Sequence, residues 1–345
     1  MSYNIALNFE DGVTRFISCK EGETVLDAAY RQKVNLPMDC SDGVCGTCKC
    51  RCEQGDFDQG DEYLEEALSD EEAAEGLVLT CQMVPSSDCV LRVPTASTLC
   101  KTQVGAIGGK VSAVAPLSES SVELAVDLPE NAELAFLPGQ YINIQVPGSE
   151  QTRSYSFSSR SGDRRASFLI RNVPNGLMSQ YLTEAAKVGD NLTLTGPLGS
   201  FYLREVKRPV LMLAGGTGLA PFLAMLATLA ERGCAQPVHM IYGVTRDSDL
   251  VKLDELDRFA TELPVFTYTT CVVDEGSCHP RKGYVTQHLD LAVLNDGDVD
   301  VYLCGPPPMV DAVRSYFREQ GITPASFHYE KFTPSLAAPA EALAA

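Results

Sequence analysis

The chain has 345 residues, which is room for two or three domains of ordinary size. Hydrophobic residues make up 45% of it and charged residues 21%, which is typical of a globular protein and excludes a disordered or fibrous chain. Its net charge of −19 repels phosphate backbones and anionic lipid surfaces, so we expect neither nucleic acid nor a membrane as a partner.

The thirteen cysteines do not indicate a secreted disulfide scaffold. Their number is odd, and the chain starts at Met1 without the basic and apolar stretch of a signal peptide, so we expect a reducing, cytoplasmic setting. Six of the cysteines lie between Cys40 and Cys81. In a reducing compartment such clustering predicts metal binding or redox chemistry.

Residues 1–99 form an acidic module, with nineteen Asp and Glu against seven Lys and Arg, or 7 − 19 = −12 of the net charge. Alternating residues on both sides of Asp11-Gly12 predict a β-hairpin over 4–17. A short helix is expected over 24–30, with Thr24 as its N-cap. The small polar residues 94–98 suggest a linker.

The cysteine cluster has the spacing C-x4-C-x2-C followed by a distant fourth cysteine, which is that of a plant-type [2Fe-2S] ferredoxin. Gly43 and Gly46 would let the loop wrap around the cluster. The alternatives are four buried free thiols, or a zinc site that includes Cys50 and Cys52. Because zinc sites usually combine two tight clips and this chain has one, we favour the iron–sulfur site. The expected ligands are Cys40, Cys45, Cys48 and Cys81.

Residues 1–99 thus resemble a chloroplast-type ferredoxin domain, and the resemblance implies a β-grasp fold. A cluster of this type carries one electron at low potential. It therefore needs an electron donor, which we expect elsewhere in the same chain.

From 104 to 206 the chain has short alternating segments separated by Pro-Gly pairs, which predicts an antiparallel β-barrel. The motif Arg153-Ser154-Tyr155-Ser156 suits a flavin, because the cation can reach a diphosphate and a serine can donate near the reactive ring edge. Taken alone, it could also be a polar-faced barrel strand. Residues 171–182 place Gly176 and Ser179 at a helix start, whose free N–H groups form a phosphate site.

Together with Gly196–Phe201, these motifs resemble the FAD domain of the ferredoxin–NADP reductase superfamily. The resemblance implies a set of FAD-binding residues, namely Arg153, Ser154, Tyr155, Ser156, Arg171, Gly176, Met178 and Ser179.

From 207 to 335 apolar strands alternate with helices, as in a doubly wound parallel sheet. Residues 210–230 carry no charge and have the length of a membrane span, but their glycines and Pro221 favour a strand, a turn and a core helix. The chain is therefore expected to be a multidomain protein of α+β and α/β class, with residues 336–345 as a flexible tail.

Two turns of the third domain resemble the nucleotide-binding motifs of the same superfamily. The first is G-x-G-x-x-P at Gly216–Pro221, which departs from the G-x-G-x-x-G dehydrogenase fingerprint, and the second begins at Cys304-Gly305. By resemblance Cys304 lies beside the nicotinamide; the alternative is a buried core cysteine. The implied nucleotide-binding residues are Gly215, Gly216, Thr217, Gly218, Pro221, Tyr242, Cys304, Gly305, Pro306 and Met309.

The end of the match, residues 328–332, resembles the terminal segment of the superfamily, in which an aromatic ring covers the flavin. Phe332 is the candidate, although it could equally be ordinary strand packing. The resemblance implies a reactive set of Ser156, Cys304, Glu330 and Phe332.

Acidic residues crowd the segment after Tyr242 and favour NADH over NADPH, with Arg246 as the contrary sign; they are Asp247, Asp249, Asp254 and Glu255.

Over about residues 1–335 the chain resembles the single-chain reductase component of bacterial aromatic-ring dioxygenases of the benzoate, toluate and anthranilate group. The resemblance implies an oxidoreductase of the ferredoxin–NAD⁺ reductase type, which passes electrons from NADH through FAD and the [2Fe-2S] cluster to a terminal oxygenase of the Rieske type. We expect the protein to be a monomer. The alternatives are the reductase of a phenol, toluene or methane monooxygenase, and a nonenzymatic electron carrier or redox sensor. We expect acidic residues near the cluster to meet a basic patch on the partner; they are Asp39, Asp42, Asp56, Asp58, Asp61, Glu62, Glu65 and Glu66.

Overall fold

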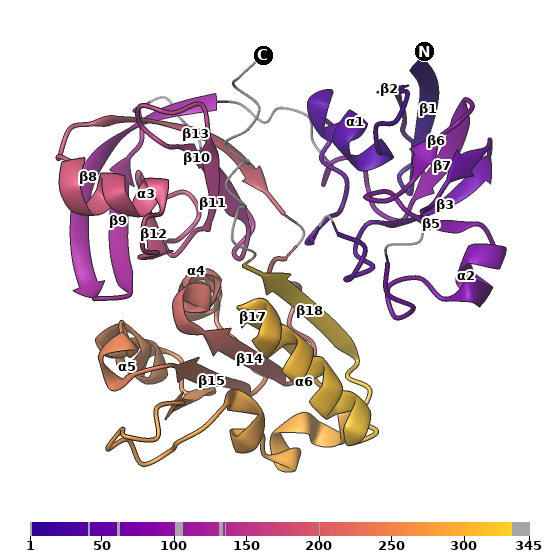
Figure 1. The fold of residues 1–345 in the computed structure, drawn as a ribbon. Coiled ribbons are helices and arrows are strands. Elements are labelled where there is room, and N and C mark those ends of the chain that lie inside the picture. Colours follow the sequence, from indigo (N-terminus) through magenta and orange to yellow (C-terminus); the bar gives the residue numbers. More distant parts are fainter. Residues whose placement is uncertain are drawn as a thin grey trace. The chain divides into compact units, whose positions relative to one another are not determined.

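A computed structural model of the chain describes residues 2–40, 42–60, 63–100, 106–130, 134, 136–199 and 201–332 (Figure 1). The expected tail at 336–345 lies outside the described residues. The chain forms two compact units, of which the first is Met1–Gly105 with Leu198–Phe201 and the second is Ala106–Pro197 with Tyr202–Ala345. The predicted boundary between residues 206 and 207 lies inside the second unit and stays a prediction.

The first unit is built on a five-stranded mixed sheet in the order β2-β1-β7-β3-β5. The predicted hairpin is confirmed as the antiparallel pair β1 and β2, and β1 also pairs in parallel with β7. The mixed sheet with its packed helix agrees with the expected β-grasp fold. The strands are β1 Ser2–Phe9, β2 Thr14–Lys20, β3 Lys49–Gln54, β5 Leu77–Leu79 and β7 Cys89–Val93, and the other elements are α1 Val25–Arg31, α2 Asp70–Ala74 and the pair β4 Phe57–Asp58 with β6 Val84–Pro85.

The start of α1 is as predicted, because the Thr24 hydroxyl accepts a hydrogen bond from the Asp27 amide at 3.2 Å. The predicted linker at 94–98 is wrong. The amide and hydroxyl of Ser97 donate to one carboxylate oxygen of Asp11 at 2.9 and 2.7 Å, and the Cys100 side chain is buried. This segment therefore belongs to the packed first unit.

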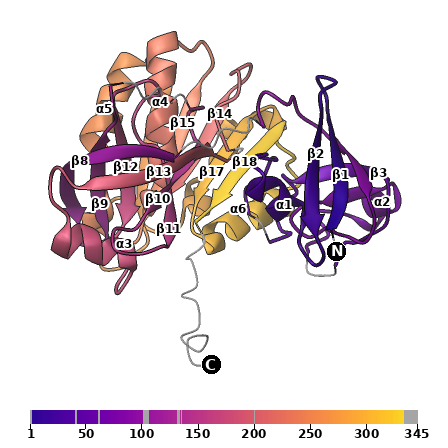
Figure 2. The same cartoon turned by 90° about the horizontal axis from the view of Figure 1, so that it is seen from above.

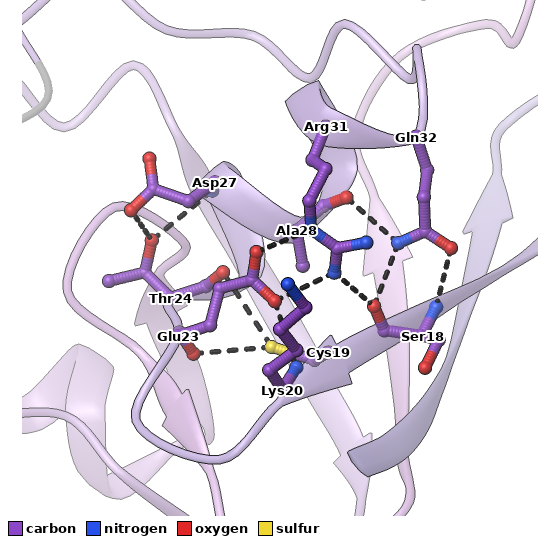
Figure 3. Close-up of polar contacts among 9 residues, drawn as sticks. All are labelled: Ser18, Cys19, Lys20, Glu23, Thr24, Asp27, Ala28, Arg31 and Gln32. Atoms are coloured by element: carbon purple, nitrogen blue, oxygen red, sulfur yellow. Dashed lines mark hydrogen bonds and ion pairs between the residues drawn. The ribbon is translucent and has the colours of Figure 1, made fainter.

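A charged network ties the end of the hairpin to α1 (Figure 3). The Arg31 guanidinium donates to both carboxylate oxygens of Glu23 at 2.7 Å and to the Ser18 carbonyl at 2.7 Å. The Lys20 amide also donates to Glu23, and the Gln32 side chain exchanges two hydrogen bonds with the Ser18 backbone. The hydrogen bond from Arg31 is the main cause that lowers the pKa of Glu23 to about 2.

Replacing Glu23 by Gln should destabilise the first unit by about 1.5 to 3 kcal/mol at pH 7, the usual contribution of hydrogen bonds to a charged group. Because the folded pKa of Glu23 lies below its unfolded value, the difference in unfolding free energy between wild type and variant should be constant above about pH 5. It should shrink as the pH falls through 4.5 toward 2. Denaturant unfolding of both proteins across this pH range measures it.

Glu75→Gln is the control, because the Glu75 carboxylate is 69% exposed and lies 3.6 Å from Arg51. A pair of this kind contributes little. If Glu23→Gln were as mild as this control, the network would not be a stabilising contact.

The predicted antiparallel barrel is confirmed in the second unit. Its six strands follow the order β11-β10-β13-β8-β9-β12, and a bridge between Phe157 and Phe168 joins the two outer strands. Phe157 stacks on Phe136 with the ring centroids 3.8 Å apart, which fills the barrel core. The elements are β8 Ala106–Ser118, β9 Ser121–Asp127, β10 Tyr141–Gln145, β11 Thr152–Ser156, β12 Arg165–Arg171, β13 Asn191–Leu198 and the helix α3 Leu177–Gln180, which continues as a π-helical turn over Tyr181–Ala185.

The same unit also contains a five-stranded, fully parallel sheet in the order β16-β15-β14-β17-β18. Helices α4 and α5 cover one face and α6 covers the other, as in the predicted doubly wound fold (Figures 1 and 2). The elements are β14 Val210–Gly215, α4 Ala220–Arg232, β15 Val238–Val244, α5 Leu253–Glu262, β16 Phe266–Val272, β17 Asp300–Gly305, α6 Pro307–Glu319 and β18 Ser326–Lys331.

The uncharged stretch 210–230 divides into β14, a 3-10 turn at Gly216–Leu219 and most of α4, as expected. In the described part of the chain no helix has both the length and the apolar character needed to cross a bilayer.

Candidate functional site

The four predicted cluster ligands meet as two pairs of sulfurs. The Cys40 and Cys45 sulfurs lie 3.0 Å apart and those of Cys48 and Cys81 lie 3.3 Å apart, both longer than a disulfide bond. Within the described ranges, no three or more Cys, His, Asp or Glu side chains gather as the ligands of one metal ion. Two pairs of thiols suit a cluster of two irons, each of which takes two protein ligands.

The zinc alternative lacks its two further ligands. Cys50 is buried in the core of the first unit, and the Cys52 thiol donates to the Gln54 carbonyl at 3.3 Å. The donor set therefore fits a [2Fe-2S] cluster better than a zinc ion.

The backbone wraps around these cysteines as the glycines predicted. Gly43 and Gly46 have φ angles of 77° and 71°, which favour glycine. The Leu64 amide donates to the Gly43 carbonyl at 3.1 Å, and a Cβ on Gly46 would lie 3.1 Å from the Ala67 carbonyl oxygen. The segment after β4 therefore supports the loop from outside.

Hydrogen bonds favour the thiolate form at one cysteine of each pair. The hydrogen bond from Cys40, aided by Thr47, lowers the pKa of Cys45 to about 6, and the hydrogen bond between Cys48 and Cys81 lowers the pKa of Cys48. The corresponding pKa values of Cys40 and Cys81 are raised. Thiolate is the form that binds metal.

In the second unit, three of the predicted reactive residues meet in a buried site. Ser156 ends β11, and its hydroxyl donates to Glu330 on β18 at 3.0 Å. The Cys304 thiol contacts the same Glu330 oxygen at 3.8 Å, because Cys304 and Glu330 are paired in the β17–β18 register. Complete burial, followed by the charge of Glu330, raises the pKa of Cys304 well above its usual value, which keeps the thiol protonated.

The glycines of the two turns allow close packing at the switch point of the parallel sheet, the usual ligand position in such folds. A Cβ on Gly218 would lie 2.3 Å from the Cys304 carbonyl oxygen. A Cβ on Gly215 or Gly305 would lie 2.4 or 2.7 Å from the Met309 sulfur. The glycines thus hold the turn after β14 against the turn after β17.

Other members of the predicted nucleotide set have different surroundings. Gly216 has a φ of 56°, and Thr217 beside it is half-buried within the 3-10 turn. Pro221 lies in the first turn of α4, where its missing N–H costs nothing, and Pro306 caps α6. Tyr242 is fully buried, and its hydroxyl donates to the Asp249 carbonyl at 3.2 Å, so its side chain packs in the core.

The predicted flavin strand presents polar groups that bond locally. The Arg153 guanidinium donates to the Thr152 carbonyl and the Gln151 side chain, both at 2.8 Å, and the Ser154 hydroxyl donates to Asn143 at 2.7 Å. Tyr155 packs against the barrel core, and its burial raises the pKa of its hydroxyl.

The predicted phosphate segment starts a helix as expected. Gly176 is the N-cap of α3, as predicted, and Arg171 is exposed at the end of β12. The Ser179 hydroxyl, however, accepts the Val173 amide at 2.8 Å, and Met178 is buried in the barrel core. Both side chains hold the turn, while the Ser179 hydroxyl still has its own proton to donate, and the phosphate role of this segment stays a prediction.

Phe332 directly follows β18, and its amide donates to the Gly305 carbonyl at 3.2 Å, which places it beside the second turn. Its role as the flavin cover stays a prediction.

Two acids of the run after β15 make hydrogen bonds within the second unit. Asp249 accepts the Ser120 hydroxyl at 2.5 Å, and Asp247 accepts the Ser277 hydroxyl at 2.8 Å.

One connection within the second unit carried no signal in the sequence. Lys252, in a left-handed backbone conformation, donates to Glu123 on β9 at 2.6 Å and also lies 3.6 Å from Glu255. It joins the barrel to the segment before α5 across 129 positions of sequence. No local pattern can reveal a pairing at that separation.

Comparisons with known proteins agree with these features. Three family models match, namely a 2Fe-2S iron-sulfur cluster binding domain over residues 8–86, an oxidoreductase FAD-binding domain over 109–202 and an oxidoreductase NAD-binding domain over 212–315. The toluate 1,2-dioxygenase electron transfer component of Pseudomonas putida is 59% identical, covering 97% of this chain and 100% of the relative. The 2-halobenzoate 1,2-dioxygenase electron transfer component of Burkholderia cepacia is 48% identical, covering 97% and 99%.

Among solved structures, an Amycolatopsis cytochrome P450 reductase has a TM-score of 0.75 at 32% identity, covering 96% of this chain and 100% of that one.

Replacing Gly218 by Ala should lower the free energy of unfolding by about 1 to 3 kcal/mol and weaken NADH binding, because the new methyl group meets a backbone oxygen that cannot rotate away. Gly108→Ala is the matched control, since its Cβ would meet nothing within 4 Å and its φ is not positive. Denaturant unfolding and calorimetric titration with NADH compare the two variants. Equal behaviour would contradict the close packing of the two turns.

Proposed function

Because the chain belongs to the family of electron transfer components of 1,2-dioxygenases, we propose that its cysteine loop, barrel and parallel sheet form one electron path from NADH to a terminal oxygenase. The protein is an NADH-dependent flavin iron–sulfur oxidoreductase with [2Fe-2S], FAD and NAD sites in one chain. The observation that carries the proposed path is the buried contact of Ser156 with Glu330, which brings the flavin motif of the barrel to the end of the parallel sheet.

The flavin supplies the chemistry that converts the two electrons of a hydride into single-electron steps. In our proposal Arg153, Ser154, Tyr155 and Gly176 hold the FAD, and the turns that start at Gly216 and Cys304 hold the NADH. The other predicted residues of each set support these contacts from the backbone or by packing.

We assign Ser156 the task of presenting a hydroxyl to the reactive edge of the flavin. Glu330 orients that hydroxyl by accepting its hydrogen bond, which Ser156 must exchange for one to the flavin, and it keeps the Cys304 thiol in place, since all three groups are buried and share one carboxylate oxygen. Burial excludes water, which strengthens these polar contacts. Phe332, at the end of β18, is the residue proposed to cover the ring.

At the other end of the path, Cys40, Cys45, Cys48 and Cys81 are the proposed cluster ligands. Their pairing supports this assignment, and so does the hydrogen bond from the Thr47 amide to the Cys45 sulfur at 3.4 Å.

The proposed partner is the terminal component, of Rieske type, of a dioxygenase that acts on an aromatic carboxylate. This proposal is supported by the names of the relatives, since toluate and 2-halobenzoate are both aromatic carboxylates. A cytoplasmic location is supported by the thirteen cysteines, none of which is paired in a disulfide.

Replacing Cys48 by Ser tests the path, because it removes one sulfur of the buried pair while the barrel and its FAD lie in the other compact unit. We expect loss of the cluster absorbance with FAD retained. NADH oxidation with ferricyanide should survive, while reduction of cytochrome c should fall at least tenfold.

Cys52→Ser is the matched control, since Cys52 lies on β3 outside both sulfur pairs and should leave the cluster in place. Retention of the cluster in Cys48→Ser would refute the ligand assignment. Equal loss of both activities with FAD retained would refute the order of the path.

The acidic surface of the first unit is the proposed docking region for the oxygenase. Asp42, Glu65 and Glu66 are exposed around the cysteine loop, and Leu64 among them is 42% exposed. Asp56 and Asp58 are also exposed, whereas Asp39 is half-buried; Asp61 and Glu62 lie outside the described residues.

If complementary charge guides this encounter, the association rate with the oxygenase should fall as ionic strength rises from about 0.01 to 0.3 M. Over this range the Debye length drops from roughly 30 Å to under 8 Å. Stopped-flow oxidation of the reduced protein by its oxygenase measures the rate. A rate independent of salt would leave apolar contact around Leu64 as the basis of docking.

A further inference from the structure

A short hydrogen bond joins the two ends of the cysteine loop. Asp39 immediately precedes Cys40, and Thr47 lies between Cys45 and Cys48. The Thr47 hydroxyl donates to a carboxylate oxygen of Asp39 at 2.6 Å, the length of a charge-assisted bond. It therefore brings a carboxylate next to the proposed cluster ligands.

The Thr47 hydroxyl has a single proton to donate. Its amide already donates to the Cys45 sulfur at 3.4 Å, so this residue lies against one of the ligands. While Asp39 accepts the hydroxyl proton, that proton is not available to the Cys45 sulfur. Asp39 therefore decides whether Cys45 receives one or two hydrogen bonds from Thr47.

We propose that Asp39 is a positioning residue that lowers the reduction potential of the cluster, by its charge and by holding the Thr47 hydroxyl proton away from the Cys45 sulfur. This inference rests on the proposed cysteine ligands. Both effects have the same sign, because reduction adds negative charge to the cluster. A neighbouring carboxylate opposes that charge, whereas a hydrogen bond to a ligand sulfur would stabilise it.

Two variants of Asp39 separate the two effects. Asp39→Asn removes the charge but keeps an acceptor for the Thr47 hydroxyl, whereas Asp39→Ala removes both. In a potentiometric titration of the full protein, followed by the spectrum of the reduced cluster, we expect Asp39→Asn to shift the one-electron equilibrium toward reduction by about three- to tenfold. Tenfold corresponds to 59 mV for one electron. Asp39→Ala should shift it further.

Asp39→Ala should shift the one-electron equilibrium further than Asp39→Asn does. This additional shift should disappear when Thr47 is also replaced by Val, because no hydroxyl then remains to turn toward the sulfur. Asp39→Ala with Thr47→Ser should keep it. Glu53→Gln removes the same charge from an exposed position on β3 and should move the equilibrium less than twofold.

Iron and sulfide content are measured for every variant. A cluster with the same potential in Asp39→Asn, Asp39→Ala and Glu53→Gln would overturn this inference and leave Asp39 a purely structural clamp. If the additional shift of the equilibrium in Asp39→Ala remained in the presence of Thr47→Val, the proposed role of the hydroxyl would be wrong. If Asp39→Ala fails to retain its cluster, the comparison of Asp39→Asn with Glu53→Gln still decides the effect of charge. Absence of a cluster from the wild type would instead refute the proposed ligands.

Discussion

The hydrogen bond from Ser156 to Glu330 is the contact on which the candidate redox site of the second unit depends. It spans 174 positions of sequence and joins the last residue of β11 to the C-terminal end of β18, with both side chains buried. A hydrogen bond to a carboxylate contributes about 1.5 to 3 kcal/mol. More important for function, it fixes the barrel motif relative to Cys304, because β17 and β18 are paired in register at Cys304 and Glu330. Gly218 extends this constraint to the turn after β14, since only a residue without Cβ can approach the Cys304 carbonyl so closely. The site is therefore a single packed arrangement and not a set of independent motifs.

Features that depend on neighbouring residues could be predicted from the sequence. The hairpin around Gly12, the Thr24 cap, the strand, turn and helix over 210–232 and the positive φ of Gly43 are all local, and all are found in the structure. The cysteine spacing is likewise local for three of its four members. In each case the physical cause acts within a few residues, so composition and spacing carry the information.

Features that depend on distant partners could not be predicted. Ser97 looked like part of a linker because its partner, Asp11, is 86 positions away. The Ser179 hydroxyl accepts the Val173 amide, a contact that the loop conformation decides and that the motif did not reveal. The Lys252–Glu123 pair had no sequence signal at all. Polar residues are the hardest to assign from sequence, because the same side chain serves a ligand or the protein's own backbone equally well.

The carboxylates of the first unit divide into those that bond within the fold and those that stay exposed. Some of its carboxylates serve the fold: Glu23 binds Arg31, and Glu72 accepts Lys49 at 2.6 Å while completing the cap of α2 with Ser69. Each of these pairs is neutral, so the net charge of −12 comes from the other acids of the unit, among them the exposed Asp42, Glu65 and Glu66 around the loop. Asp39 is half-buried; its carboxylate accepts the Thr47 hydroxyl within the fold and also lies beside the proposed cluster ligands. Acidity in this unit thus stabilises the fold, and in our proposals it also acts on the cluster through Asp39 and on the oxygenase through the exposed carboxylates.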